Sequence, residues 1–225
     1  MAEIHPELQL AQFIEHTCLG PITTVTTVEQ FCWEADRYRF AAVCVPPLHL
    51  ASAVNTLHKK PVEVWSVVGF PLGTSTDQAK LYAAQQLTDL GAQGLEVVPQ
   101  LTWFKEGDPN RVYRELAQIV QATRIPIRAV LEISLLQPTE LKTALQICGD
   151  AGVRGVKTGS GWGGDVTREQ VQQVAGLTRG RIEIKAAGGI KTLDHALELL
   201  LAGATRLGTS RSVELLHQQA RQAAS

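Results

Sequence analysis

The fold is decided by the stretch Val153-Arg154-Gly155-Val156-Lys157-Thr158, which is followed after one intervening segment by Ile182-Glu183-Ile184-Lys185-Ala186-Ala187-Gly188-Gly189. Each run is short, rich in apolar residues, ends at or near a lysine and leads into glycines. A helical pattern lies between them, so the two runs read as parallel strands joined by a helix.

The same alternation of short apolar runs and amphipathic stretches fills the rest of the chain. Eight strands are expected, at residues 13–19, 40–45, 62–70, 94–98, 125–131, 155–157, 182–185 and 205–208. No linker or long structureless segment separates them. The pattern predicts the α/β class, as one closed (β/α)₈ TIM barrel over residues 1–225 with a short N-terminal helix. An open doubly wound sheet is the alternative.

The helix expected at residues 75–90 illustrates the intervening segments. Ser75 and Gln78 have the spacing of a capping box, and Gly91 ends the helix. The apolar residues expected on its buried face are Ala79, Ala83, Leu87 and Leu90. Two further helices are expected at residues 138–151 and 192–202, each followed by glycine before the next strand. The charged helix residues expected in water are Asp77, Lys80 and Arg111.

Composition narrows the class of function. The chain has 225 residues, is 44% hydrophobic and carries a formal net charge of −1 without runs of like charge. We therefore expect neither a nucleic-acid nor a membrane partner. The cysteines lie in apolar segments without C-x-x-C spacing, which indicates reduced, packed thiols and a cytoplasmic protein: Cys18, Cys32, Cys44 and Cys148.

The two lysines are the first candidates for chemistry. In a barrel, Lys157 and Lys185 end neighbouring strands about 4.7–4.9 Å apart, so their amines can approach one another. A lysine amine has a free pKa of about 10.4, and both burial and a nearby ammonium favour the neutral form that attacks carbonyl carbon. The pair predicts an enzyme that works through a Schiff base.

Glycine-rich segments follow the sixth, seventh and eighth strands, at residues 159–161, 188–189 and 207–210. Backbone N–H groups without side chains in the way can bind phosphate oxygens, and barrel enzymes commonly bind phosphate after strands seven and eight. Arg211 and Lys191 could add positive charge. The residues expected to bind substrate are Thr158, Ser160, Gly161, Gly188, Gly189, Gly208 and Ser210.

From about residue 14 to residue 210 the chain resembles the deoxyribose-phosphate aldolase family. The matching segments are Ile14-Glu15-His16-Thr17, Val43-Cys44-Val45 with Pro47, Val68-Gly69-Phe70-Pro71-Leu72-Gly73, Gly91-Ala92, Val156-Lys157-Thr158 and Lys185-Ala186-Ala187-Gly188-Gly189-Ile190. The resemblance implies that Lys157 forms the Schiff base, that Lys185 lowers the pKa of Lys157, and that Glu96 stands where the family has a proton-relaying aspartate.

The implied activity is that of a class I aldolase, a lyase of deoxyribonucleotide catabolism that cleaves 2-deoxy-D-ribose 5-phosphate to acetaldehyde and D-glyceraldehyde 3-phosphate. The protonated imine is the electron sink, so no metal or other cofactor is expected. The expected partners are a sugar phosphate and aldehydes, with a homodimer as the candidate assembly. Two alternatives are a Schiff-base aldolase with a different donor or acceptor and a catalytically weak paralogue that binds a sugar phosphate.

The chain departs from the family at informative positions. Glu15 and Glu96 replace aspartates, and the usual Thr-Ser-Thr-Gly after the reactive lysine becomes Thr158-Gly159-Ser160-Gly161. Trp162, which follows, is a candidate wall of the pocket. His16 is interpreted either as orienting a carboxylate or as structural, and Cys44 as a buried packing residue without a base beside it.

Overall fold

A computed structural model of the chain describes residues 9–223, in which eight parallel strands close into a barrel with β8 pairing back to β1. The strands are β1 (Ile14–Thr17), β2 (Ala42–Val45), β3 (Glu63–Val68), β4 (Gly94–Val97), β5 (Ile127–Val130), β6 (Gly155–Lys157), β7 (Glu183–Ala187) and β8 (Arg206–Thr209). The predicted closed barrel is confirmed, and the open sheet is wrong.

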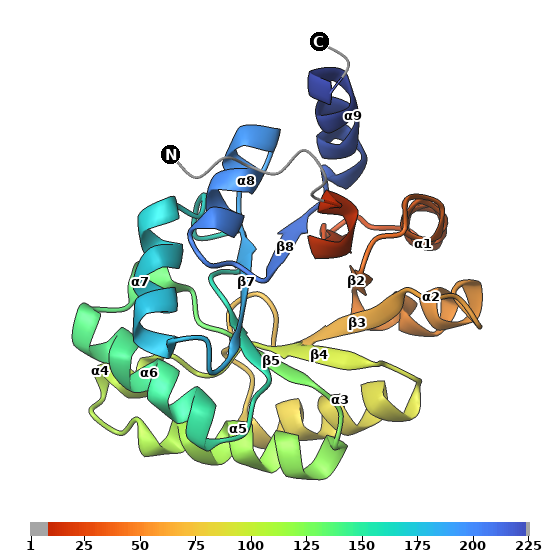
Figure 1. Ribbon diagram of the computed structural model, residues 1–225. Coiled ribbons are helices and arrows are strands. Elements are labelled where there is room, and N and C mark those ends of the chain that lie inside the picture. The colour runs from red at the N-terminus through yellow and green to blue at the C-terminus, as the bar shows by residue number, and fades with distance from the viewer. Residues whose placement is uncertain (1–8, 224–225) are drawn as a thin grey trace.

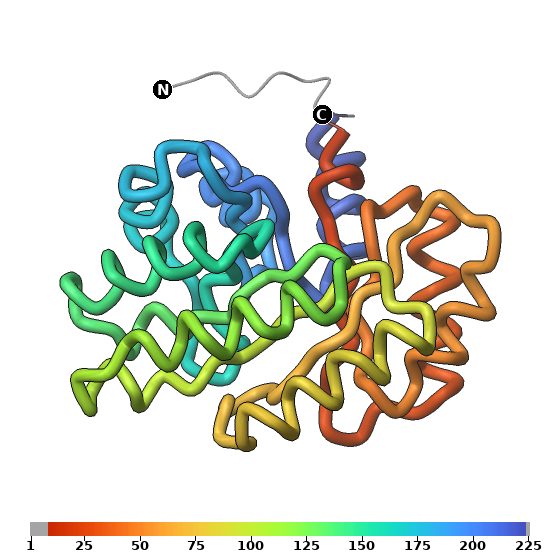
Figure 2. Tube along the Cα trace, turned by 90° about the horizontal axis from the view of Figure 1, so that it is seen from below, coloured from red at the N-terminus to blue at the C-terminus, as the bar shows by residue number. Residues whose placement is uncertain are grey.

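The helices surround the barrel (Figure 1). They are α1 (Val25–Tyr38), α2 (Leu50–Thr56), α3 (Asp77–Asp89), α4 (Thr102–Lys105), α5 (Asn110–Thr123), α6 (Pro138–Asp150), α7 (Arg168–Thr178), α8 (Leu193–Leu201) and α9 (Ser212–Ala223). Three 3₁₀ turns accompany them in the described part of the chain, η1 (Leu10–Phe13), η2 (Pro47–His49) and η3 (Ile133–Leu135). The short N-terminal helix predicted from the sequence is η1, which lies against α9 (Figure 2).

The main apolar core lies between the barrel and its helices, because the strands of a barrel are covered on their outer face. A second, small apolar cluster comes from β2 and β3: Ala42, Cys44, Trp65 and Val67. The indole ring of Trp65 lies 4.2 Å from the guanidinium of Arg128, which places this cluster inside the barrel. Much of the remaining interior is charged, and this polar interior positions the site.

Helix α3 corrects two expectations. Its N-cap is Thr76, whose Oγ1 accepts a hydrogen bond from Ala79 N at 3.3 Å, so the capping box starting at Ser75 is wrong. Of the predicted buried face, Leu87 is buried, Ala83 is half-buried, and Ala79 and Leu90 are exposed. The buried residues of the helix are Lys80, Ala84 and Leu87. Lys80 is therefore buried, contrary to prediction, because its Nζ lies 2.7 Å from Oε1 of Glu115 on α5. Asp77 and Arg111 are exposed as expected.

Other expectations agree with the structure. The glycines after α3, α6 and α8 adopt positive φ angles and end those helices: Gly91, Gly152 and Gly203. The four cysteines are free and buried. None of the helices in the described part of the chain is both long and apolar enough to cross a bilayer. Residues 1–8 and 224–225 lie outside that part, so a single domain over residues 1–225 stays a prediction.

Candidate active site

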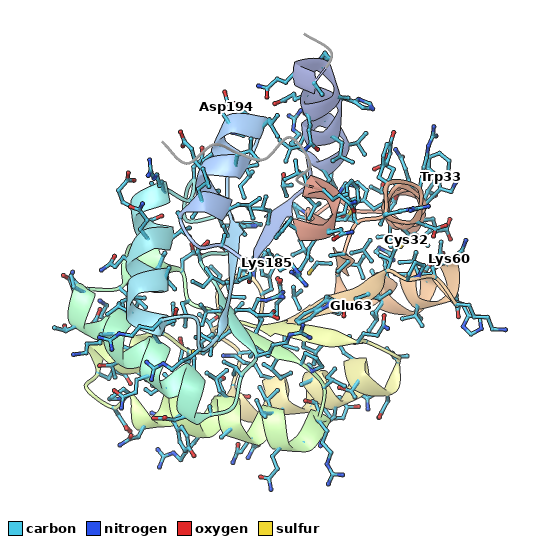
Figure 3. All side chains as sticks on the ribbon, viewed as in Figure 1. Cys32, Trp33, Lys60, Glu63, Lys185 and Asp194 are labelled. Atoms are coloured by element: carbon cyan, nitrogen blue, oxygen red, sulfur yellow. The ribbon has the colours of Figure 1, made fainter. Side chains whose placement is uncertain are left out.

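Lys157 and Lys185 lie side by side inside the barrel. Lys157 is the last residue of β6, Lys185 lies within β7, and the two residues are direct partners in the strand register. Their side chains are 1% and 0% exposed. Figure 3 shows Lys185 in the centre of the molecule, whereas Lys60 lies at the periphery. The predicted juxtaposition of the two lysines is confirmed, although β7 continues for two residues beyond Lys185.

A carboxylate bridges the two amines, which the sequence analysis expected to approach one another directly. Glu96, on β4, lies with Oε2 2.8 Å from Nζ of Lys157 and with Oε1 2.6 Å from Nζ of Lys185. Its side chain is fully buried. Each carboxylate oxygen therefore contacts one amine, and Glu96 bridges the two lysines.

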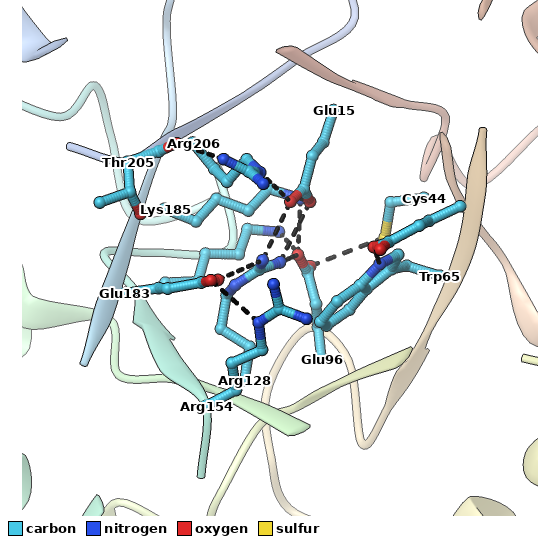
Figure 4. A network of polar contacts seen from close by, with 12 residues as sticks. Glu15, Cys44, Trp65, Glu96, Arg128, Arg154, Glu183, Lys185, Thr205 and Arg206 are labelled. Atoms are coloured by element: carbon cyan, nitrogen blue, oxygen red, sulfur yellow. Dashed lines mark hydrogen bonds and ion pairs between the residues drawn. The ribbon is translucent and has the colours of Figure 1, made fainter. Parts of the chain in front are cut away.

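Two further charged residues complete the cluster (Figure 4). Arg128 on β5 makes a two-pronged contact with Glu15 on β1, at 3.0 and 2.9 Å, and its Nη1 also lies 3.3 Å from Oε1 of Glu96. Glu15 in turn accepts a hydrogen bond from Lys185 at 2.5 Å. Sequence reasoning missed Arg128, although a charged residue inside the otherwise apolar strand Ile127-Arg128-Ala129-Val130 was a usable signal.

The charges of these five side chains nearly cancel. Two carboxylates face one guanidinium and two amines, so the cluster carries +1 when both lysines are protonated and zero when one is neutral. Burial alone would raise the pKa of Glu96, but Lys157, Lys185 and Arg128 outweigh it and hold that pKa well below its usual range. The pKa of Glu15 is likewise lowered, because Lys185 and Arg128 outweigh the effect of burial. Both carboxyl groups are therefore ionised.

The two lysines differ in their surroundings. Burial disfavours the charged form of Lys185, yet Glu15 and Glu96 outweigh burial and raise the pKa of Lys185 above its ordinary value. Lys185 is thus held as an ammonium by two carboxylates. Among the residues that the structure describes, Lys157 has one carboxylate partner, Glu96, and its Nζ lies 5.5 Å from the ring centroid of Phe70 on the loop after β3.

A cleft of about 330 Å³ opens beside Phe70. Its lining includes Leu19, His49, Pro71 and Trp162, the last of which is 63% exposed. Trp162 therefore forms part of the wall of this cleft.

Cys44 and His16, two other candidates from the sequence, pack as structural residues. Burial raises the pKa of the Cys44 thiol to about 12, with Glu96 adding to the rise, so this thiol is neutral. The ring of His16 stacks on Phe31, and its Nε2 lies 2.8 Å from Oε2 of Glu34. His16 thus contacts a carboxylate of the outer helix α1, not one of the barrel carboxylates.

The loop after β6 is organised by hydrogen bonds within the protein. The Thr158 hydroxyl donates to the carbonyl of Ala187 at 3.2 Å and accepts from its N–H at 3.1 Å. Ser160 donates from both its backbone N and its hydroxyl to Oε2 of Glu132. The hydroxyls expected to contact substrate are therefore already used to connect β6, β7 and Glu132.

The expected phosphate-binding glycines separate into two groups. Gly188 and Gly189 follow β7 with φ angles of 115° and 65°, and Gly161 approaches Gly188. Gly208 instead lies within β8, where a Cβ would be 2.5 Å from Cε of Lys185. Gly208 therefore gives space to Lys185, while Gly188, Gly189 and the exposed Ser210 remain at the carboxyl end of the barrel.

No family model matches the chain. It is 50% identical over 219 residues to a deoxyribose-phosphate aldolase of Gloeobacter violaceus, covering 97% of both chains, and 48% identical over 212 residues to one of Thermosynechococcus vestitus, covering 94% and 98%.

Solved structures agree. An aldolase named QR15 superposes with a TM-score of 0.91 at 31% identity, covering 96% of this chain and 98% of the other. The tetrameric deoxyribose phosphate aldolase from Aeropyrum pernix superposes with a TM-score of 0.87 at 31% identity, covering 92% and 89%.

Proposed function

The chain belongs to the deoxyribose-phosphate aldolase family, and from that premise we propose which of its residues carry the reaction. The activity is cleavage of 2-deoxy-D-ribose 5-phosphate to acetaldehyde and D-glyceraldehyde 3-phosphate through a lysine Schiff base. The observation that supports the assignment of roles is the bridging of Lys157 and Lys185 by the two oxygens of Glu96.

Lys157 is the nucleophile in this proposal. Lys185 contacts two carboxylates and Lys157 contacts one, so removal of the Lys157 proton breaks fewer ion pairs. The five-residue cluster then has zero net charge. A neutral Lys157 amine can attack C1 of the open-chain aldehyde to give a carbinolamine, which loses water to form an iminium.

Glu96 serves as the counterion of a positive charge that moves between the two nitrogens. The Lys185 ammonium gives a proton to the departing carbinolamine oxygen, and the positive charge reappears on the Lys157 iminium. Because Glu96 contacts both nitrogen positions, the carboxylate stays paired before and after the transfer. Its lowered pKa favours this electrostatic role over that of a base.

Cleavage breaks the C2–C3 bond, since acetaldehyde carries two carbons. The C3 hydroxyl proton passes to the neutral Lys185 amine, the C3 oxygen becomes the carbonyl of glyceraldehyde 3-phosphate, and the C2–C3 electron pair moves into the iminium to form an enamine. The Lys185 ammonium returns this proton to C2 of the enamine, which restores an iminium. Water then adds to the iminium carbon and gives a proton back to Lys185, and collapse of the carbinolamine releases acetaldehyde and free Lys157.

The phosphate end of the substrate lies, in this proposal, at the backbone of Gly188 and Gly189 with Ser210 assisting. These residues follow the seventh and eighth strands, the usual phosphate position in barrels of this kind. Thr158, Ser160 and Gly161 shape the neighbouring loop, and Gly208 acts through the space that it leaves for Lys185.

The assignment is tested by the rate of 2-deoxyribose 5-phosphate cleavage, which is measured through enzymatic reduction of the aldehyde products. Lys157→Met should abolish turnover, and Lys185→Met should lower it strongly, because the proton donor is lost. Lys142→Met, on the exposed face of α6, is the matched control and should leave the rate unchanged. Turnover by Lys157→Met would contradict the proposal.

We further propose a cytoplasmic homodimer. The buried, unpaired cysteines support a reducing compartment, and the Aeropyrum pernix relative is described as a tetramer, which shows that a structural relative assembles. The mass in solution from light scattering tests the dimer.

A further inference from the structure

An acidic side chain lies against the glycine pair that follows β7. A Cβ built on Gly189 would lie 1.9 Å from both Cγ and Oδ1 of Asp165, so the Asp165 carboxylate contacts the bare backbone of Gly189. Asp165 comes from the loop after β6. An anion bound at the backbone of Gly189 would thus meet a carboxylate with no side chain between them.

The protein fixes this loop from both sides. Val166 N donates to the carbonyl of Gly188 at 3.1 Å, and the carbonyl of Val166 lies 3.0 Å from Nε2 of His195 on α8. At the other end of the loop, Ser160 is bonded to Glu132 through two hydrogen bonds. Asp165 is therefore placed beside Gly189 by its neighbours.

The Asp165 carboxylate is not neutralised in this position. The side chain is exposed and, within residues 9–223, makes no hydrogen bond or ion pair. Arg211, near the same end of the barrel, is bonded to both carboxylate oxygens of Glu214 at 2.8 and 2.9 Å. The carboxylate is thus available to repel an anion at the glycine pair.

We propose that Asp165 is a specificity-determining residue that weakens the preference of this enzyme for phosphorylated over unphosphorylated substrates. The inference rests on the proposed phosphate position at Gly188 and Gly189. A phosphate monoester carries about −1.5 to −2 charges at neutral pH. By Coulomb's law in water, a carboxylate about 6–7 Å from a bound dianion weakens the binding of that dianion roughly tenfold. A neutral hydroxymethyl group in the same place is unaffected.

The test compares Asp165→Asn with the parent on 2-deoxyribose 5-phosphate and on 2-deoxyribose. Removing the charge at constant shape should raise kcat/KM for the phosphorylated substrate roughly tenfold at low ionic strength, because KM falls. The value of kcat/KM for 2-deoxyribose should stay unchanged. The gain should shrink in high salt because salt screens exposed charges. Asp150→Asn, an exposed carboxylate at the end of α6, is the control and should change neither value.

Asp165→Ala guards against a loop effect and should reproduce the gain. An unchanged ratio between the two substrates in both Asp165 variants would overturn the proposal, as would an equal change for both substrates. Calorimetric binding of inorganic phosphate separates this outcome from failure of the proposed function. Tighter phosphate binding by Asp165→Asn supports the inference even without turnover, whereas unaltered binding contradicts it.

Discussion

Glu96 is the residue whose replacement should disturb both stability and catalysis. Its buried carboxylate contacts Lys157 at 2.8 Å, Lys185 at 2.6 Å and Arg128 at 3.3 Å. Glu96→Gln removes one charge and raises the net charge of the cluster by one unit. At an effective dielectric constant of 20, the attraction to Lys157 alone is about 6 kcal/mol before desolvation is subtracted.

The net cost of Glu96→Gln is smaller, because a buried charge is costly to desolvate. Breaking a buried ion pair by removing one partner typically costs about 3–5 kcal/mol, and we expect a loss of this size in the free energy of unfolding. Glu96→Asp keeps the charge but withdraws it by one methylene. Displacement of a catalytic group by about 1 Å can cost about a hundredfold in rate, so this variant should lose activity with a smaller loss of stability.

The assay pairs urea unfolding with the rate of 2-deoxyribose 5-phosphate cleavage. Glu115→Gln is the matched control, because it also removes a buried carboxylate from a lysine, Lys80, but lies outside the barrel. It should lose comparable stability and keep its kcat, whereas Glu96→Gln should lose more activity than Glu96→Asp. Activity in Glu96→Gln equal to that of Glu115→Gln would refute the role of Glu96. A gain of activity in Glu96→Asp would show that the longer side chain detunes the transfer.

Three other predictions address the supporting structure. Gly208→Ala should lower activity strongly and cost about 1–3 kcal/mol in unfolding experiments, because the new Cβ displaces Cε of Lys185; parental kinetics would contradict this. Lys80→Met should cost about 3–5 kcal/mol, and the double variant with Glu115→Leu should recover part of that loss; additive losses would show that the two residues are not coupled. Because the pKa of Glu15 is lowered from its ordinary value of 4.5, Glu15 stabilises the fold above pH 4.5, and this stability should be lost as pH falls from 4.5 through the lowered pKa. Glu15→Gln should therefore reduce the fall of the urea unfolding midpoint at acid pH. An unchanged fall would contradict the pairing of Glu15 with Lys185 and Arg128.

The sequence carries much of the fold because its signals are local. Strand ends, helix-ending glycines and the repeat of strand and helix follow from neighbours in the chain, and the register of Lys157 with Lys185 follows from adjacent strands. The burial of Lys80 on α3 could not be read in this way. Lys80 belongs to the buried face because its partner Glu115 lies on another helix.

The rest of the site depends on barrel closure. Glu15 and Arg128 are 113 residues apart in the chain, and their contact arises because β1 and β5 both project side chains into the closed interior. The dual contact of Glu96 and the approach of Asp165 to Gly189 likewise join different strands or loops. Sequence patterns indicated charged residues at some of these positions, but pairing them requires three-dimensional distances.

Reductive trapping of the imine with acetaldehyde and borohydride, followed by peptide mapping, tests directly whether Lys157 forms the Schiff base. We predict one reduced two-carbon adduct on Lys157, with Lys185 unmodified. The adduct should be absent in Lys157→Met and present in the Lys142→Met control. An adduct on Lys185, or its persistence elsewhere when Lys157 is replaced, would contradict the assignment of Lys157 as the Schiff-base lysine.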